Sequence, residues 1–536
     1  YHRAGTMSRI RSTAFTLAAV SSFSLMDAAQ AQSLPGEDFR IGKTAAFGSI
    51  SGNSVTNLHA DGDTVWVGPL GDYSHDRGAN WISAGADSLS IRRGRMFSID
   101  VEGPTVWIGI GYSQRTTTSG SVDFIPTALG FNFSTDGGRT WDFRLPQLDQ
   151  PNDTVEVYGV STLKALPIIV PEQSPPFDID FDPETGWIWT AAWASGIRRS
   201  EDGGRTWNRV VLPPDTLDEI TPDRLYDFPF APERGPADEA NNFLGFSVLV
   251  DETGTVWAGT AGGLNRSEDA RVAGRDASWR RFHYDGTTRG LVGNWITSIE
   301  EQPLEGRNAI WAACWPATEQ GEDFGITVTR DGGETFEQVL IGAKVYDFAF
   351  DGETVYAAGD DGLFVTSDGG QTWETVRYFT DADRPDRPVR PDATVFSVAK
   401  TFSDLWVGTD DGLMRSSDSA GTWSLFRSEV PLQPDTPNAS APSVDTYAYP
   451  NPYAPSSDGY LKIRFEQSTS QSVTVRVFDF GSNVVRTFDL SAASPGVREV
   501  VWDGTDDRGV LVANGVYFYT VEKPDETVSG KILVID

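Results

Sequence analysis

The stretch Ser200-Glu201-Asp202-Gly203-Gly204-Arg205-Thr206-Trp207 recurs along the chain and decides the fold. Its short hydroxyl and carboxylate side chains can bond nearby backbone N–H groups, and its glycines supply positive φ. The pattern is therefore that of a tight hairpin, and the Trp begins the next strand. Seven copies are present, some of them degenerate, and each contains one aspartate: Asp76, Asp136, Asp202, Asp269, Asp331, Asp368 and Asp418.

A second phrase, a strand built around tryptophan, lies upstream of most copies; Thr255-Val256-Trp257-Ala258-Gly259 is an example. Another apolar strand, such as Phe246-Ser247-Val248-Leu249-Val250, precedes it. Each unit therefore predicts four short strands: an inner strand, the Trp strand, the strand entering the hairpin and the strand leaving it. Four-stranded repeats of roughly 40–50 residues are typical of a β-propeller. Seven copies favour seven blades.

The eight-residue pattern resembles the Asp-box repeat, S-x-D-x-G-x-T-W, over about residues 45–427. This resemblance implies a propeller whose boxes are structural and lie at its periphery, so we assign the seven aspartates no ligand. Asp-box propellers include sialidases, xyloglucanases, sortilin-type receptors and photosystem-assembly factors. The resemblance therefore implies a fold without selecting a function.

Long segments occur only after the Trp strand and between blades. In an up-and-down blade these two connections share one face, and loops commonly carry binding function. We therefore expect a loop-rich face that contacts a ligand. The candidate ligand-binding side chains are Trp193, Trp315, Tyr112, Arg115, Tyr226, His283, Arg289 and Trp295.

Trp193 and Trp315 each lie four residues after the strand Trp of their blade, near the expected mouth of the central channel. They could form a stacking platform for a sugar or a peptide, or they could pin down their own loops. The acidic pairs Asp360-Asp361 and Asp410-Asp411 also point toward this face. Paired carboxylates can perform glycosidase chemistry, but Asp-Asp-Gly is also turn chemistry, and we predict turns.

The N-terminal 1–31 reads as an extension followed by a secretory signal, with an apolar run and Ala29-Gln30-Ala31 as a cleavage site. The run is too short to span a bilayer, so we expect no transmembrane segment in the mature chain. The propeller is expected over 32–427, with residues 39–50 either completing the last blade or lying outside it. Phe39-Arg40-Ile41-Gly42 resembles the F/Y-R-I-P phrase of sialidases without its proline, and we interpret it as a strand that packs on or closes the ring.

Proline-rich residues 428–446 predict a stiff linker. About seven short strands in 447–536 are typical of a β-sandwich. Tyr449-Pro450-Asn451-Pro452 and Trp502-Asp503-Gly504 resemble the Ig-like module of the flagellar hook-capping protein (FlgD) and the sorting domain of type IX secretion substrates. That resemblance implies contact with outer-membrane secretion machinery, then release or surface attachment. The expected fold is all-β: a seven-bladed propeller plus a C-terminal Ig-like sandwich.

The net charge of −33 disfavours nucleic acid as a partner, because phosphate repels such a surface. The sequence offers no Ser/His/Asp set, metal-ligand cluster or phosphate loop, so we assign no catalytic residue, no metal and no cofactor. We predict a secreted or cell-surface, non-catalytic protein that binds an extracellular glycan or protein through its loop-rich face. The alternative is a glycoside hydrolase, sialidase-like or xyloglucanase-like. It would need two carboxylates across the channel mouth, or an arginine cluster there.

Overall fold

The computed structural model describes residues 46–47, 50, 52–83, 94–118, 121–232, 240–306, 308–382, 389–390, 392–427, 445–449, 451–455, 460–467, 471–493, 496–524 and 526–535. The predicted signal segment and Phe39-Arg40-Ile41-Gly42 lie outside these residues, as does most of the predicted linker. In the described part of the chain, no helix is long and apolar enough to cross a membrane.

Seven antiparallel sheets follow one another along the described chain, each with its strands in sequence order. We number these sheets as blades 1 to 7 and give the strands of each from the innermost outward. Blades 1 to 3 contain β2 (Leu58–Asp61), β3 (Thr64–Val67), β4 (Asp72–Ser74) and β5 (Trp81–Ser83); β6 (Arg95–Glu102), β7 (Thr105–Thr118), β8 (Ser121–Ser134) and β9 (Asp142–Arg144); and β12 (Asp178–Asp182), β13 (Trp187–Ala192), β14 (Gly196–Ser200) and β15 (Asn208–Arg209).

Blades 4 and 5 contain β17 (Gly245–Val250), β18 (Val256–Thr260), β19 (Gly263–Ser267) and β20 (Trp279–Phe282); and β21 (Trp295–Gln302), β22 (Ala309–Trp315), β23 (Gly325–Thr329) and β24 (Glu337–Val339). Blades 6 and 7 contain β25 (Val345–Asp351), β26 (Thr354–Gly359), β27 (Gly362–Thr366) and β28 (Glu374–Val376); and β29 (Val395–Lys400), β30 (Leu405–Thr409), β31 (Gly412–Ser416) and β32 (Ser424–Phe426).

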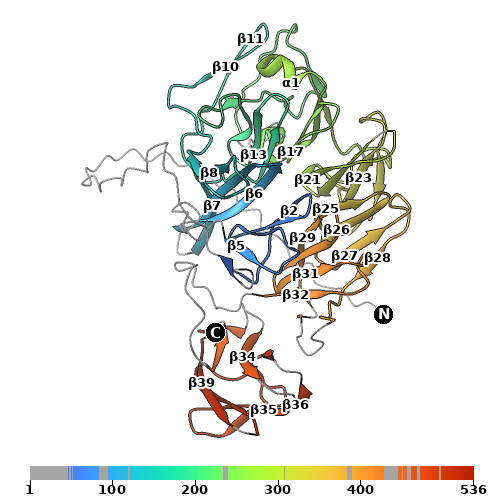
Figure 1. Cartoon of the computed structure of the whole chain (residues 1–536). Helices are drawn as coiled ribbons and strands as arrows, with labels where there is room; N and C mark the ends of the chain where they lie inside the picture. The colour runs from blue at the N-terminus through green and yellow to red at the C-terminus, as the bar shows by residue number, and fades with distance from the viewer. Residues whose placement is uncertain are drawn as a thin grey trace, which may run out of the picture.

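The innermost strands contact one another in chain order, and β29 contacts β2, so the sheets close into a ring (Figure 1). The predicted all-β fold, a propeller followed by an Ig-like sandwich, is confirmed. Short additions decorate the ring: β10 (Val155–Tyr158) pairs with β11 (Ser161–Lys164), and β16 (Glu219–Ile220) extends blade 4. The described helical segments are α1 (Ala270–Ala273), η2 (Asn241–Phe243) and η3 (Gly274–Asp276).

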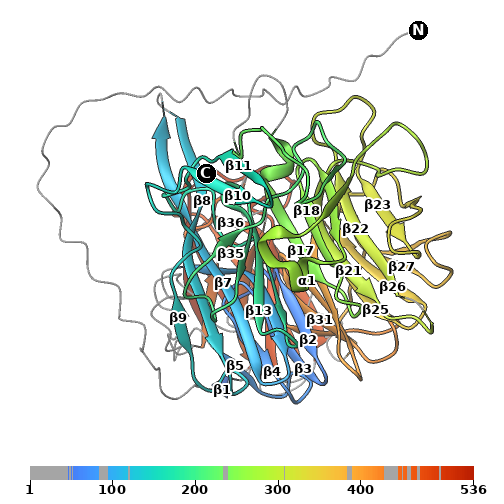
Figure 2. The same cartoon turned by 90° about the horizontal axis from the view of Figure 1, so that it is seen from above.

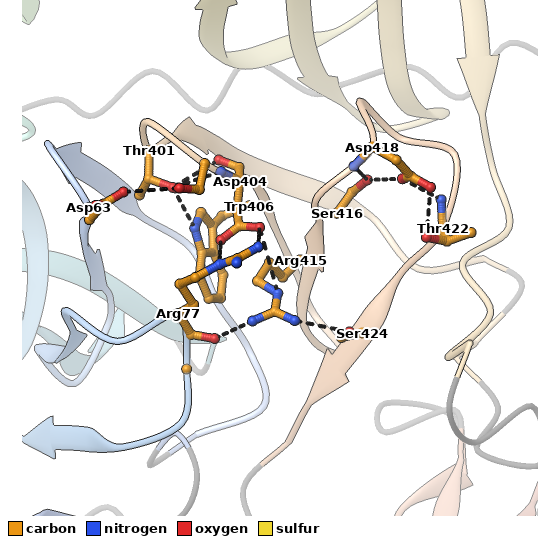
Figure 3. Close-up of polar contacts among 12 residues, drawn as sticks. Asp63, Arg77, Thr401, Asp404, Trp406, Arg415, Ser416, Asp418, Thr422 and Ser424 are labelled. Atoms are coloured by element: carbon orange, nitrogen blue, oxygen red, sulfur yellow. Dashed lines mark hydrogen bonds and ion pairs between the residues drawn. The ribbon is translucent and has the colours of Figure 1, made fainter.

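The ring is closed by side chains and loop contacts, because all four strands of blade 7 come from consecutive residues. β1 (Ala46–Phe47) pairs instead with the outer strand β5 of blade 1, so these two residues lie outside the last blade. At this seam Arg77 donates two hydrogen bonds of 2.6 Å to Asp404, and Arg415 donates to the carbonyl of Arg77 (Figure 3). Trp81 packs edge-on against Trp406, with ring centroids 6.0 Å apart.

In six of the seven blades the eight-residue stretch, here named the box, joins the third and fourth strands by the same pattern of hydrogen bonds. In blade 4 Asp269 accepts the N–H of Ser278, across a short insertion, at 2.8 Å. In blade 3 the Ser200 hydroxyl donates to Asp202 at 2.9 Å, and the Gly204 N–H donates to Ser200 at 2.9 Å. Thr206 gives Asp202 both its N–H and its hydroxyl, at 2.9 and 2.7 Å. The hydrogen bonds of the box carboxylate are therefore made within its own hairpin, as expected for a structural role.

The second glycine of a box is required by the Trp strand of the preceding blade. A Cβ placed on Gly138 would lie 2.5 Å from the ring of Trp66, and Gly138 has a φ of +80°. The same approach brings Gly204 against Trp107. Box and Trp strand are therefore two halves of one contact between neighbouring blades, which explains why the two phrases recur together.

One expected loop is a strand pair. The long segment that follows the Trp strand of blade 2 is expected to be a loop, but β7 and β8 continue as paired strands, with Thr118 paired to Ser121. Figure 2 shows this hairpin rising past the body of the ring. Thr116, Thr117 and Thr118 are β-branched residues that favour strands, and the continued pairing satisfies backbone groups that a loop would expose.

The C-terminal sandwich has two sheets around one core. The first contains β33 (Thr446–Tyr449), β34 (Leu461–Gln467) and β37 (Gly496–Trp502); the second contains β35 (Gln471–Phe478), β36 (Val484–Ala493), β38 (Gly515–Glu522) and β39 (Thr527–Val534). Trp502, Tyr453 and Val475 are fully buried between them. The sandwich lies beside β31 and β32 of the ring (Figure 1).

Candidate functional site

The innermost strands of five blades carry a β-bulge at the same place. β6, β17, β21, β25 and β29 each skip one residue in their pairing with the second strand. A bulge re-aims the side chain of the extra residue. The extra residues are Phe97, Phe246, Thr297, Tyr346 and Phe396, four of them aromatic. Phe177 completes the set from blade 3, immediately before β12.

Aromatic rings from blades 2 to 7 form one continuous series around the ring axis, here named the aromatic rim. Successive ring centroids lie 4.9 to 6.0 Å apart. All are half-buried. Six of them stand at or directly before the start of the innermost strands, and Trp193 and Trp315 stand at the ends of the paired second strands, where the long connections emerge. The rim therefore borders the loop-rich face. Its members are Phe97, Phe177, Trp193, Phe246, Trp295, Trp315, Tyr346 and Phe396.

Three residues chosen from the sequence meet in the rim. Trp193 lies 5.3 Å from Phe246 and 5.7 Å from Trp295, and Trp295 lies 5.9 Å from Trp315. The Trp315 indole N–H donates to the carbonyl of Val345 in the next blade at 2.9 Å. These tryptophans therefore bridge neighbouring blades while keeping part of each ring exposed.

Two cations of the chain lie over rings of the rim. The Lys344 ammonium is 4.4 Å from the centre of Trp315 and 5.1 Å from that of Tyr346. The Arg95 guanidinium is 4.7 Å from the centre of Phe97. Such contacts are attractive because the face of an aromatic ring is electronegative.

Acidic side chains follow the rim by one or three residues along the innermost strands. Asp178 accepts the N–H of Val248 at 2.9 Å, and Asp347 accepts the N–H of Val398 at 3.0 Å. Each of these bonds joins one innermost strand to the next blade. Asp100 and Asp180 make the equivalent bonds to Phe181 and Val250, at 2.6 and 2.9 Å. These four carboxylates therefore tie neighbouring innermost strands together.

Glu300 belongs to the same acidic set but differs from the others. Among the described residues it makes no hydrogen bond and no ion pair. Burial, and then repulsion from Asp347 and Asp178, hold the pKa of Glu300 well above its usual range. Burial also raises the pKa of Asp178 and of Asp347 to about 7. The site therefore contains carboxyl groups that can hold a proton near neutral pH.

The other predicted site residues lie in the surrounding segments. Tyr112 belongs to the β7–β8 hairpin, where Arg115 pairs with Phe124. Tyr226 is half-buried and accepts the N–H of Thr221 at 3.0 Å.

His283 and Arg289 come from the connection between blades 4 and 5. The Nε2 atom of His283 lies 3.4 Å from Asp218, and Arg289 is exposed. Within the described side chains, Tyr112, Tyr226, His283 and Arg289 make no ring contact or hydrogen bond with the rim.

The sequence reasoning missed most of the rim, although a signal was available. The aromatic member is followed by a small hydroxyl or carboxylate residue, and in four of the five pairs this residue bonds the next blade. The recurring pairs are Phe97-Ser98, Phe177-Asp178, Phe246-Ser247, Tyr346-Asp347 and Phe396-Ser397.

A buried charge network joins blade 7 to the sandwich, at the same end of the blade as the rim. Asp410 and Asp411 form the predicted turn between β30 and β31, but Asp411 is also buried. Arg427 donates to Asp411 at 2.7 Å and to Glu499 of β37 at 3.0 Å. Lys462 of β34 pairs with Asp411, and the Arg427 side chain is 0% exposed.

A hollow of about 190 Å³ lies elsewhere, between blades 1 and 2 on the box side, and is lined by His75 and Arg139 among others. Its aromatic residues Trp66 and Tyr73 stack on each other at 4.2 Å and are almost fully buried. The hollow therefore presents little aromatic surface, unlike the rim.

Comparison with solved structures finds distant similarities. PorZ, a surface component of the type-IX secretion system of Porphyromonas gingivalis, is 13% identical with a TM-score of 0.33, covering 90% of this chain and 82% of PorZ. The GH74 enzyme of Niastella koreensis is 10% identical with a TM-score of 0.45, covering 92% and 74%. YCF48 from Cyanidioschyzon merolae is 18% identical with a TM-score of 0.39, covering 72% and 98%.

At these identities and scores the three structures say nothing about the activity of this chain. No curated protein matches its sequence. For the C-terminal sandwich a family model does match: residues 454–526 match the FlgD Ig-like domain family.

Proposed function

We propose that this protein is a secreted or surface-displayed binding protein whose aromatic rim holds an extracellular glycan. The observation that carries the proposal is the continuous series of half-buried aromatic rings on six blades. Aromatic side chains bury a large area and prefer flat apolar partners, and the C–H face of a sugar ring is such a partner. Exposed apolar surface gathered in one place commonly marks a binding site.

Trp193, Trp295 and Trp315 form the centre of the proposed site. Tyr112, Arg115, His283 and Arg289 are proposed as contacts from the segments around it. Tyr226 is the weakest of the predicted contacts, because its ring lies 6.2 Å from buried Tyr158 and packs on the core shared by blades 3 and 4.

A glycan array on the full chain, with a hydrolysis readout on the same glycans, tests this function. Trp315→Ala and Trp193→Ala should abolish the binding that the unmodified protein shows. Tyr378→Ala is the matched control, because Tyr378 is 74% exposed and lies outside the rim. Binding that survives both tryptophan substitutions would refute the rim as the site.

The domain organisation proposed with this function is a signal segment in 1–31, an Asp-box propeller over 32–427, a linker over 428–446 and a sorting module over 447–536. The repeated hydrogen bonds of the boxes support the second part, and the FlgD Ig-like match supports the last. The module would contact outer-membrane secretion machinery. Deleting 447–536 in the native host should stop delivery, and normal delivery of the truncated protein would refute this role.

A glycoside hydrolase is the second candidate function, and Glu300 is the observation that favours it. A carboxyl group with a raised pKa, to which no other described residue donates a hydrogen bond, can donate a proton to a glycosidic oxygen. Asp178 and Asp347 are the carboxylates available as its partner. Cleavage of an array glycan that disappears in Glu300→Gln would establish this activity, and binding without turnover would eliminate it.

A further inference from the structure

We infer that the glycan held by the rim is acidic and carries carboxylate groups on its sugars. This inference rests on the proposed function and names the chemical class of the ligand at the same site. It follows from Lys344 and Arg95, the two cations that lie over rim rings. The side chains of both make no hydrogen bond with any described residue.

Lys344 is held in place where blades 5 and 6 meet. Its ammonium lies 4.4 Å from the ring centre of Trp315 and 5.1 Å from that of Tyr346. Trp315 is itself fixed, because its indole N–H donates to the carbonyl of Val345 at 2.9 Å. The side chain of Lys344 is 31% exposed, so a ligand at the rim can reach the ammonium.

Asp360 is the acidic neighbour of Lys344, and its carboxylate is bonded to another residue. The Tyr346 hydroxyl donates to Asp360. The Lys344 ammonium stands 3.9 Å from Oδ2 of Asp360, which is beyond hydrogen-bond distance. An exposed pair of this kind contributes at most about 1 kcal/mol. Lys344 therefore keeps its hydrogen-bond donors for an acceptor on a ligand.

Arg95 repeats the arrangement on blade 2. Its guanidinium lies 4.7 Å from the ring centre of Phe97, and the residue is exposed. Within the part of the chain that the structure describes, the Arg95 side chain forms no ion pair. The rim therefore has two places, on blades 2 and 6, where an aromatic ring lies directly beside hydrogen-bond donors that carry positive charge.

A sugar that bears a carboxylate matches both features of such a place. Its ring offers a C–H face to the aromatic side chains, and its carboxylate accepts strong, charge-assisted hydrogen bonds from an ammonium or a guanidinium. The net charge of −33 opposes an acidic ligand at long range. Salt at about 0.15 M screens this repulsion beyond about 8 Å, so the short contacts to Lys344 and Arg95 decide the preference.

The test measures binding of an oligogalacturonate and of its methyl ester of equal length to the full chain, at about 0.15 M salt. The two probes have the same sugar rings, but only the free acid is charged. We expect the free acid to bind about tenfold more tightly, the scale of one hydrogen bond to a charged group. Lys344→Gln and Arg95→Gln should each remove a large part of this preference. Arg139→Gln is the matched control, because it removes the same charge from an exposed position on the box side and should leave the preference intact.

Asp360→Asn should change the affinity in the opposite direction. Asparagine keeps an oxygen that can accept the Tyr346 hydroxyl, but it removes the negative charge 3.9 Å from the Lys344 ammonium. We expect the affinity for the free acid to rise about threefold. A fall in this affinity would show that Lys344 and Asp360 serve only as a structural pair, and would overturn the inference.

Three further outcomes separate the inference from the proposed function. A preference for the free acid that is undiminished in both Lys344→Gln and Arg95→Gln would overturn the inference, as would equal or weaker binding of the free acid; both leave the proposed function standing. Competition by oligoglutamate as effective as by the oligogalacturonate would show that the rim binds carboxylates on a peptide, which refutes the glycan class. If neither probe nor any other glycan binds, the proposed function itself fails.

Discussion

Arg77→Met tests whether a single ion pair holds the ring shut. Methionine keeps much of the apolar stem but removes both hydrogen bonds to Asp404. The Asp404 side chain is 0% exposed and Arg77 is 49% exposed, so the pair lies between surface and interior. The nearest remaining cation, Arg415, stands 4.0 Å from the carboxylate.

The expected cost follows from that intermediate burial. Removing one partner of a fully buried pair costs about 3–5 kcal/mol, whereas an exposed pair contributes about 0–1 kcal/mol. Because one partner is buried and the other is half exposed, we expect the free energy of unfolding to fall by about 2 kcal/mol. Arg139→Met is the control, since Arg139 is exposed in a box of blade 2 and makes no ion pair among the described residues.

Equilibrium denaturation gives the size of the effect, and hydrogen exchange gives its location. Two backbone bonds cross the seam: Phe402 N–H to the carbonyl of Gly62 at 2.9 Å, and Val55 N–H to the carbonyl of Thr409 at 2.7 Å. We expect these amides to exchange faster in Arg77→Met, with the other blades unchanged. An unaltered free energy of unfolding, or faster exchange spread evenly over all blades, would refute closure by this pair.

Further predictions concern the domain contact and the acidic groups. Arg427→Met leaves Asp411 and Glu499 buried with one cation between them, so docking should weaken by about 3–5 kcal/mol; calorimetry should then resolve a separate transition for the sandwich, and one unchanged transition would contradict this. Burial raises the pKa of Asp347 from 3.8 to about 7, so its contribution to stability is present below pH 3.8 and is lost as the pH rises to about 7. Asp347→Asn should therefore raise the melting temperature at pH 7 and leave it unchanged near pH 4. Equal shifts of the melting temperature at both pH values would refute the raised pKa of Asp347. Hydrogen bonds from Thr372 lower the pKa of Asp368 to about 2, so its contribution is present above pH 3.8 and is lost as the pH falls to about 2. Asp368→Asn should flatten the acid-unfolding curve between about pH 3.8 and pH 2. An unchanged curve would contradict a structural role for the box of Asp368.

The blades could be predicted from the sequence because their signals are local. Six of the seven boxes are closed by bonds between residues at most four apart, as Asp202 and Thr206 show. Its partner, the Trp strand, recurs upstream of most boxes. Neither feature depends on knowing which segments meet in space, so both are legible in a single chain.

The rim could be predicted only in part, because a bulge is a property of strand pairing. Trp193 and Trp315 could be predicted because each follows a strand Trp by four residues in the sequence. Phe97, Phe246 and Phe396 look like ordinary strand residues in the sequence, and only the skipped register distinguishes them. Tyr226, chosen because it lies in a long connection, packs against the core shared by blades 3 and 4.

The domain contact could not be predicted, since it pairs residues far apart in sequence. Asp411 and Lys462 are 51 positions apart, and Asp411 sits in an Asp-Asp-Gly turn that fully accounts for its presence locally. Nothing in the composition of either segment marks the other as its partner. Such a contact can be recognised only once the three-dimensional structure is known.

The docking of the sandwich on blade 7 sets the direction in which the protein faces its surroundings. Arg427, Asp411 and Glu499 fix the sandwich at the end of the blade that also carries Phe396. If the sandwich anchors the protein to a surface, every copy presents its rim at one common angle. A long polymer that binds one copy is then already aligned with the binding site of the next. An array of weak sites would therefore bind the polymer with high avidity, without any contact between copies.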